Sequence, residues 1–323
     1  MPSLLEDFRN QEIVGSGTFT LIFSAIDTID DRAYSIKRIT VLTPKRYNLA
    51  KREAEIMAKL DHSSIVKYQR TWSEEPPNEI CKKEYKRVWS VWKEKAKAKN
   101  LPDTSTGIQS ARGYKFMDIV DPAAISYRYI QMELCQDYNL DIWLKRWIEF
   151  GNSQWVKPTD DRSLHRMKCW FRTIVEAVNY FHSQGIVHND LRPENVYFSK
   201  YNDDILKIGG FSRAISLNDK KKSNFEVLIN DGDLYKGPEL ISDDKISQKS
   251  DVYALGLIFC ELVSVFESEL SKVKAFEVLR DQKVPSELQS KTDEANFILS
   301  MMKADPEERP NCNEILNMSY MKF

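Results

Sequence analysis

A short glycine-rich segment near the N-terminus has residue types that suit phosphate binding. Residues 15–19 read GSGTF and lie between two runs of strand-forming residues. Glycine has no Cβ, so such a backbone could approach nucleotide phosphates closely. Thr20 stands where a G-x-G-x-x-G loop would have its third glycine, and an ordinary β-turn would show similar residues. The segment therefore predicts either a phosphate-binding loop or a simple hairpin turn.

Two charged residues could act together near this segment. Lys37 shares a strand face with Ser35, because side chains alternate along a strand. Glu53 falls on the apolar face of a helical pattern from Asn48 to Leu60. Taken separately, the lysine would be solvent-exposed, and the glutamate would lie at the edge of the apolar helix face and reach solvent. Taken together, they predict an internal ion pair, because each charge explains the other.

The most informative motifs lie in the second half of the chain. Residues 186–195 read IVHNDLRPEN, and residues 206–212 read LKIGGFS. These segments resemble the catalytic loop H-R-D-L-x-x-x-N and the D-F-G motif of protein kinases, at the usual separation. Further matches are GPE at 237–239, the D-x-x-x-x-G pattern at 251–256, and Arg309. The resemblance extends from about Phe8 to Met318.

The resemblance implies a single protein kinase domain over residues 1–323, with an α+β, bilobal fold. A small β-rich N-lobe with one main helix is expected over about residues 8–134. A larger helical C-lobe is expected over about residues 135–323. The N-lobe would contain a kinase insert over about residues 74–124.

The family also implies roles for particular residues. Lys37 would contact the phosphates of ATP and pair with Glu53, and Asp190 would accept the proton of the substrate hydroxyl. Asn195 would bind one magnesium ion. Met132 resembles the residue that guards the adenine pocket, and Ser35 would make the roof of that pocket more polar. The expected nucleotide contacts are Gly15, Gly17, Ile22, Ser35, Lys37, Met132, Glu133 and Cys135.

Gly210 occupies the position of the metal-binding acid in the D-F-G motif. Glycine offers no ligand, whereas phosphoryl transfer relies mainly on positioning and charge neutralisation. Loss of one main electrostatic contributor lowers a rate by about a hundredfold to a thousandfold. The sequence thus predicts a pseudokinase that acts through protein contacts and binds ATP weakly, and it argues against magnesium binding. The alternative is a Ser/Thr kinase with weak or metal-independent catalysis.

Other positions depart from the family pattern in the same direction. Arg192 replaces the catalytic-loop lysine, and Asn189 replaces an arginine that often pairs with an activation-loop phosphate. Glu277 stands where the substrate-docking helix usually has a threonine, which reverses the local charge. Residues expected to support the scaffold remain, namely His188, Phe211, Glu239, Asp251 and Arg309. The further departures are Thr20, Ser212 and Gly232.

A subfamily is also indicated. Residues 34–39, 58–62, 129–135 and 254–258 resemble kinases of the translation initiation factor 2 α-subunit, most closely the endoplasmic-reticulum-stress and double-stranded-RNA-activated types. Those kinases also carry an insertion between the fourth and fifth strands. The resemblance implies a role in translation regulation and stress response. Expected partners are the initiation factor α-subunit or a related kinase, in a homodimer or heterodimer.

The insert contains a Lys-rich helical pattern that follows Pro76 and Pro77. Its apolar face predicts packing on the body of the domain with the lysines in solvent. RNA binding is the alternative, although no known RNA-binding module is present and nucleic acid is not an expected partner. The residues of the apolar face are Cys81, Tyr85, Val88 and Trp92.

The bulk composition excludes several classes of protein. With 47 Lys+Arg against 48 Asp+Glu, the net charge of −1 gives no global attraction to nucleic acid or membranes. Five scattered cysteines without a CxxC pair argue against disulfides and zinc. The apolar run from Val252 to Phe266 is too short to span a membrane and predicts a buried helix. Without a secretory signal, the expected location is the cytoplasm, with the nucleus as the alternative.

Overall fold

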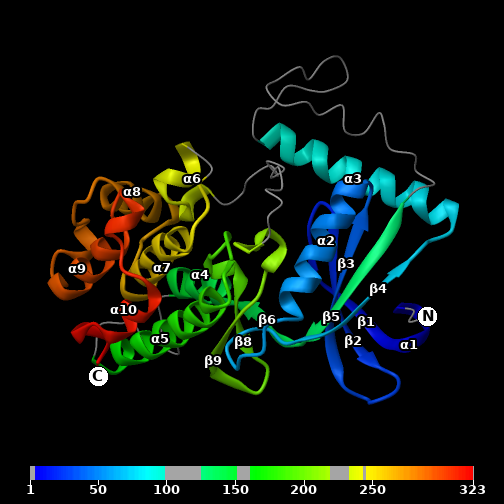
Figure 1. Ribbon diagram of the computed structural model, residues 1–323, viewed down its shortest axis with the longest axis horizontal. Helices are drawn as coiled ribbons and strands as arrows, with labels where there is room; N and C mark the ends of the chain where they lie inside the picture. The colour runs from blue at the N-terminus through cyan, green and yellow to red at the C-terminus, as the bar shows by residue number, and fades with distance from the viewer. Residues whose placement is uncertain (1–3, 99–124, 151–160, 219–232, 243–244, 323) are drawn as a thin grey trace. The chain divides into compact units, whose positions relative to one another are not determined.

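The computed structural model describes residues 4–98, 125–150, 161–218, 233–242 and 245–322 (Figure 1). The chain forms two compact units. The first unit takes in Met1–Ala58 and Lys67–Leu134, and the second takes in Lys59–Val66 with most of the chain from Cys135 onward. Residues 59–66 join the second unit because the backbones of Ser64 and Val66 hydrogen-bond to Ile208.

A five-stranded antiparallel sheet forms the centre of the first unit. Its strand order is β1-β2-β3-β5-β4, so β5 lies between β3 and β4 although an insertion precedes it in the chain. β-branched and aromatic residues alternate with polar ones in these strands, which suits a pleated surface. The strand-forming runs on both sides of residues 15–19 and the strand that carries Ser35 and Lys37 are confirmed as the first three strands. The strands are β1 (Phe8–Ser16), β2 (Thr20–Asp27), β3 (Ala33–Val41), β4 (Tyr68–Glu74) and β5 (Ser126–Glu133).

The helix α2 (Pro44–Met57) covers one face of this sheet. Thr43 caps its N-terminus by accepting a hydrogen bond from the backbone N–H of Arg46 at 3.3 Å. Pro44 is the first residue of the helix, where its missing N–H has no cost. The predicted helix is confirmed, but it begins four residues earlier and ends three residues earlier than the apolar pattern suggested, because Thr43 and Pro44 set its start.

The opposite face of the sheet is covered by α3 (Asn78–Ala98), the helix of the insert, shown in cyan in Figure 1. Cys81 and Val88 are fully buried in a cluster with sheet residues such as Ile36 and Tyr127. The short helix α1 (Leu4–Asp7) adds Leu4 to the same cluster. The predicted packing of the insert helix is therefore confirmed for these positions. The side chain of Trp92 and residues 103–113 lie outside the described residues.

A buried carboxylate on α3 ties the insert to β3. Glu84 accepts hydrogen bonds from Thr40 Oγ1 at 2.6 Å, Arg38 Nη2 at 3.1 Å and Arg87 Nη2 at 2.6 Å. Burial opposes its ionisation, but the hydrogen bonds from Arg87 and Thr40 outweigh burial and lower the pKa of Glu84. Arg87 also donates to the backbone oxygen of Gly17 at 3.4 Å. The helix therefore contacts the glycine-rich segment as well as the sheet.

The second unit is mainly helical, as the sequence predicts, with two small sheets. One sheet has the order β6-β8-β9, and the other pairs β7 with β10. The strands are β6 (Cys135–Asn139), β7 (Ile186–Val187), β8 (Val196–Ser199), β9 (Asn202–Ile208) and β10 (Ile215–Ser216). The helices are α4 (Leu140–Phe150), α5 (Asp161–Ser183), α6 (Pro238–Ser242), α7 (Gln248–Val263), α8 (Glu269–Arg280), α9 (Thr292–Met301) and α10 (Cys312–Asn317).

Helices α5 and α7 form the core of the second unit. Every residue of α7 from Ser250 to Val263 is buried, which fits a helix that is apolar on all sides. The inner face of α5, including Trp170 and Phe181, is also buried. Gly185 ends the α5 segment with a φ of 71°, a conformation that favours glycine. The buried helix predicted at Val252–Phe266 is confirmed, with α7 beginning four residues earlier and ending three residues earlier.

The cysteine and membrane expectations can be compared with the structure. All five cysteines are free thiols, and Cys81, Cys260 and Cys312 are buried. Burial raises the pKa of the Cys260 thiol to about 12. Within the described residues, no helix combines the length and apolar composition required to cross a bilayer.

Candidate active site

The predicted ion pair between Lys37 and Glu53 is present in the first unit. Lys37 Nζ lies 2.6 Å from Glu53 Oε1, and the two side chains are 12% and 4% exposed. Lys37 projects from β3, and Glu53 projects from the buried face of α2. The pair therefore joins the sheet to its main helix and places a cation on the face of the sheet that α2 covers.

The glycine-rich segment forms a tight hairpin between β1 and β2. The backbone N–H of Gly17 donates to the backbone oxygen of Thr20 at 2.8 Å. A Cβ at Gly17 would lie only 2.6 Å from Thr20 Oγ1, so a larger residue there would require the Thr20 hydroxyl to move. Phe19 at the tip packs against the cluster that contains α3, and the Arg46 guanidinium lies over its ring. Thr20 therefore closes the hairpin in place of a third glycine.

Strand register brings four predicted nucleotide contacts to one face of the sheet. Ile22 lies opposite Lys37, and Ser35 lies opposite Met132. Because alternate residues share a face, all four side chains project toward the side that bears Glu53. Glu133 follows Met132 and projects to the other side. Two predicted contacts remain. Gly15 lies on β1 and pairs with Ile22 of β2, and Cys135 begins β6 in the second unit.

In the second unit, Asp190 and Asn195 lie together in the loop between β7 and β8. The Asn195 amide donates to the backbone oxygen of Asp190 at 2.8 Å and to its carboxylate Oδ2 at 3.2 Å. Asp251, on the buried helix α7, accepts hydrogen bonds from the backbone N–H groups of His188 and Asn189 at 2.8 and 2.9 Å. The loop is therefore held by the core helix, and Asp190 is held by its own neighbour in the loop.

Gly210 has a left-handed backbone, with φ 76° and ψ 36°. A Cβ built there would lie 2.3 Å from Asn195 Oδ1 and 2.4 Å from its Cγ. The Asn195 amide therefore occupies the space in which an acidic side chain would begin. These residues do not fit a magnesium ion held by the two motif positions.

Two arginines that belong to this region pair with acids. Arg192 Nε donates to Glu194 Oε2 at 2.8 Å, and its Nη2 contacts Glu194 Oε1. Burial opposes ionisation of Glu194, but the bond and charge of Arg192 outweigh burial and lower the pKa of that carboxyl. Arg213 Nη1 lies 3.6 Å from Asp190 Oδ1. Arg192 thus points to Glu194, and Asp190 has a cation beside it that the sequence analysis missed.

The position of Arg213 had a signal in the sequence. Residues 211–213 form a 3-10 helix, η3, that begins immediately after Gly210. A 3-10 helix has three residues per turn, so residues three apart lie above one another. The structure places Arg213, at the end of this turn, beside Asp190. A basic residue three positions after Gly210 could have been recognised as a candidate partner for that carboxylate.

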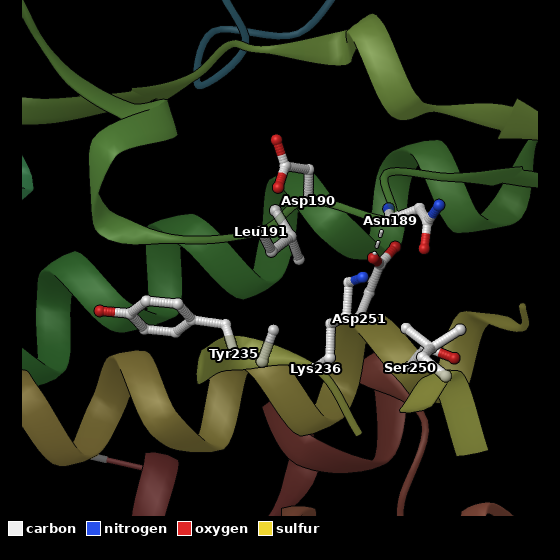
Figure 2. A pocket seen from close by; sticks show the side chains of 9 residues that line it. Asn189, Asp190, Leu191, Tyr235, Lys236, Ser250 and Asp251 are labelled. Carbon is white, nitrogen blue, oxygen red and sulfur yellow. Dashed lines mark hydrogen bonds between the residues drawn. The ribbon is translucent and has the colours of Figure 1, made fainter. Parts of the chain in front are cut away.

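A small cavity lies beside Asp190 (Figure 2). Its volume of about 20 Å³ suffices for a water molecule but not for an amino-acid side chain. Figure 2 shows Tyr235 and Lys236 on one side of it and Asp251 on α7 below the loop. The Tyr235 hydroxyl donates to the buried carboxylate of Glu261 on α7, so α7 holds this side of the cavity in place. Gly232, one of the positions that depart from the kinase family pattern, lies outside the described residues.

Charged scaffold residues expected from the sequence are present and paired. Arg309 is fully buried and donates to both carboxylate oxygens of Glu239 at 2.8 Å. His188 Nε2 bonds to the backbone oxygen of Gly209 at 2.8 Å. A bidentate, buried arginine pair of this kind is held rigidly because both groups are fully satisfied. The elements that support the loop are thus intact.

Comparison with known proteins agrees with this arrangement. The protein kinase domain family matches residues 8–321. The chain is 30% identical over 312 residues to the interferon-induced, double-stranded RNA-activated protein kinase of Rattus norvegicus, covering 96% of this chain and 51% of the relative. It therefore spans about half the length of that relative.

Two further relatives carry names that refer to initiation factor 2. Eukaryotic translation initiation factor 2-alpha kinase pek-1 of Caenorhabditis elegans is 28% identical over 214 residues, covering 62% of this chain and 19% of the relative. The eIF-2-alpha kinase GCN2 of Arabidopsis thaliana is 26% identical over 344 residues, covering 98% of this chain and 25% of the relative. The chain therefore belongs to the protein kinase family, as a domain similar to those of the initiation factor 2α kinases.

Proposed function

We propose that this domain is a pseudokinase of the initiation factor 2α kinase group, which binds ATP weakly and acts through contacts with other proteins. The observation that carries the proposal is Gly210, whose neighbour Asn195 occupies the space of the missing acid. A kinase needs metal ions to neutralise the charge that develops on the transferred phosphoryl group. A site without the bridging acid loses a large electrostatic contribution to the transition state.

Weak nucleotide binding is supported by the first unit. Lys37 is paired with Glu53 and held on the same sheet face as Ile22, Ser35 and Met132. Gly17 presents no Cβ at its own position in the hairpin between β1 and β2. A lysine and a glycine-rich hairpin would contact the phosphates of ATP, and a polar Ser35 would weaken the apolar contact with adenine.

Action through protein contacts is supported by the preserved scaffold of the second unit. The Glu239–Arg309 ion pair and the hydrogen bonds from the loop to Asp251 are all formed. None of these contacts involves a metal ion. A folded kinase domain with impaired chemistry can still present its surfaces to partners. We propose the initiation factor 2 α-subunit or a related kinase as the partner, in a homodimer or heterodimer. The cytoplasm is the proposed location.

The test combines ATP binding with phosphoryl transfer. Thermal unfolding of the natural protein should show a small stabilisation by ATP that is the same with magnesium and with EDTA. Label from radioactive ATP should not reach the recombinant initiation factor 2 α-subunit above the level given by Asp190→Ala. Magnesium-dependent transfer that disappears in Asp190→Ala would contradict the proposal.

The second candidate is a Ser/Thr kinase with weak or metal-independent catalysis. It is favoured by the retained ion pair of Lys37 with Glu53 and by the contact of Asn195 with Asp190. Such a kinase would transfer label in EDTA, and Asp190→Ala would abolish that transfer. The same two measurements therefore separate the two candidates.

A further inference from the structure

The insert helix α3 reaches the glycine-rich hairpin through one arginine. Arg87 Nη1 donates to the backbone oxygen of Gly17 at 3.4 Å. The other two guanidinium nitrogens donate to the carboxylate of Glu84, Nη2 at 2.6 Å and Nε at 3.1 Å. Paired hydrogen bonds to one carboxylate fix the plane of a guanidinium group. The remaining nitrogen of Arg87 is therefore presented to the hairpin in a fixed direction.

The carboxylate that orients Arg87 is itself held on the sheet. Glu84 is 7% exposed and accepts a hydrogen bond from Thr40 Oγ1 at 2.6 Å. The backbone N–H of Thr40 donates to the backbone oxygen of Phe19 at 2.7 Å. The same carboxylate is thus linked to two carbonyl groups of the hairpin, one through Arg87 and one through Thr40. All of these residues belong to the first unit.

The contact of Arg87 with Gly17 also sets the direction of the next N–H group. The peptide between Gly17 and Thr18 is trans, so its C=O and N–H bonds point in opposite directions. The N–H of Thr18 therefore points away from Arg87 and from α3. Ile36 packs in the cluster that contains α3, so the next residue, Lys37, projects to the other face of the sheet.

We propose that Arg87 is a positioning residue for a nucleotide phosphate bound on the Lys37 side of the first sheet. By holding the carbonyl of Gly17, it keeps that oxygen from facing the phosphate and presents the N–H of Thr18 instead. Backbone N–H groups in tight turns bind anions, whereas a carbonyl oxygen repels them. The insert helix thereby sets the affinity of the first unit for ATP. The inference rests on the proposed function, because it concerns the weak ATP binding assigned to this unit.

The first test observes the Gly17–Thr18 peptide directly. It is the only Gly–Thr pair in the sequence, so carbonyl-¹³C glycine and ¹⁵N threonine together give a single signal in an HNCO spectrum. Arg87→Gln should move this signal in the absence of nucleotide. The glutamine side chain is too short to reach the Gly17 oxygen, although its amide can still donate to Glu84. An unmoved signal would overturn the proposal.

The second test follows the same signal while ATP is added in EDTA. In the natural protein ATP should move the Thr18 signal, whereas adenosine, which has no phosphate, should not. Arg87→Gln should weaken ATP affinity by about fivefold or more, as expected for the loss of one hydrogen bond. An equal shift with adenosine would overturn the assignment to a phosphate. Unchanged ATP affinity in Arg87→Gln would show that the contact only supports the fold, and would also overturn the proposal.

Lys86→Gln is the matched control. Lys86 precedes Arg87 on the same helix and is exposed, so its replacement removes an equal charge on the solvent side of the helix. It should leave the signal in place and change ATP affinity by less than about twofold, because an exposed charge is screened by solvent and salt. An equal loss of affinity in both variants would mean that only the charge of the helix matters, which would overturn the role of Arg87.

Arg87→Lys replaces Arg87→Gln if the latter does not fold. Its ammonium group keeps a positive charge beside Glu84 but ends one bond short of the position of Nη1. Arg87→Lys should therefore also move the Gly17–Thr18 signal and weaken ATP binding. An unmoved signal in this variant would overturn the proposal.

The outcomes separate this inference from the proposed function. Equal ATP affinity in the natural protein and Arg87→Gln would overturn the role of Arg87 and leave the proposed function in place. Magnesium-dependent phosphoryl transfer by the natural chain that requires Asp190 would overturn the proposed function instead. The role of Arg87 would then stand, because an active kinase would bind its nucleotide at the same hairpin.

Discussion

Single buried charges have the largest expected effects in this domain, and Lys37 is the clearest case. Replacing it with methionine would leave Glu53, which is 4% exposed, without its cation. Loss of one partner from a buried pair destabilises a protein by about 3 kcal/mol or more, because the remaining charge has lost its compensation. Lys37→Met should therefore lower the free energy of unfolding by about that amount in urea titrations followed by circular dichroism.

Arg9→Ala is the control for this measurement. Arg9 pairs with Asp31 at 2.7 Å in the same unit, but the two side chains are 54% and 73% exposed. Exposed pairs contribute about 0 to 1 kcal/mol, so this variant should unfold almost as the natural protein does. If both substitutions lower the free energy of unfolding equally, the charge of Glu53 must be compensated in another way.

The pairs Lys37–Glu53 and Arg213–Asp190 differ in how far the sequence predicted them. Glu53 was recognisable because a charge on an apolar helix stripe needs a partner, and Lys37 supplied one on a neighbouring strand. Arg213 had only its spacing from Gly210 as a signal, because it lies in a single 3-10 turn rather than in a longer periodic element. Asn195 stays a predicted magnesium ligand, and in the structure its amide donates to Asp190 and lies beside Gly210. Short turns fix such contacts through backbone angles, which the motif alone does not specify.

At the scale of elements, the insert helix α3 is a structural part of the first unit. Glu84→Ala should destabilise the protein by about 2 to 3 kcal/mol, because Arg38 and Thr40 would lose a buried acceptor. Hydrogen exchange should also rise at the amide of Thr40 and in the Gly17 hairpin, since Arg87 is oriented by Glu84.

Glu79→Ala provides the comparison on the same helix. Glu79 is exposed in the first turn of α3, so its removal should change stability by less than about 0.5 kcal/mol. Similar stabilities for the two variants, with unchanged exchange at Thr40, would mean that α3 is not anchored by its buried carboxylate.

The role of α3 could have been read more fully from the sequence. Glu84 follows Cys81 by three residues and precedes Val88 by four, so it lies on the apolar stripe. The argument that identified Glu53 applies equally to this glutamate. Lysines at positions 82, 83 and 86 are nearer in the sequence, so the partners of Glu84 do not follow from its position alone. Besides Arg87 on the same helix, the partners are Arg38 and Thr40, which lie on a strand far earlier in the chain.

At the scale of the whole molecule, one buried carboxyl should shape the pH dependence of stability. Glu261 on α7 is buried, and burial raises its pKa to about 7, opposed by Lys272 and by the Tyr235 hydroxyl. The ordinary value is 4.5, so the folded state holds this proton more tightly than the unfolded state does. The stability due to this group is complete below pH 4.5 and is lost as the pH rises through about 7.

Replacing Glu261 with glutamine should therefore reduce the loss of stability between about pH 5 and 8. The difference in free energy of unfolding between the variant and the natural protein should change by about 2 to 3 kcal/mol over this range. Denaturant unfolding at a series of pH values measures it, with Glu277→Gln on the exposed side of α8 as the control. Parallel profiles for all three proteins would exclude Glu261 as the titrating group.

Motifs spread along the chain made the kinase fold predictable as a whole. Arg309 and Glu239 lie 70 residues apart, yet family resemblance implied that both support the scaffold, and they form a buried pair. The small strands β6 to β10 were not predicted, because runs of two to seven residues give weak periodic signals. Their pairing depends on the loop around Asp190 and on α5, which only the folded chain brings together.

The coverage of the first sheet on both faces has a practical consequence for handling the protein. Here a deletion that included α3 would uncover Ile36 and Tyr127, together with the stacked rings of Trp72 and Tyr129. A continuous aromatic surface of that kind promotes aggregation. Shortened versions should therefore keep the chain through Ala98 and remove residues only beyond it.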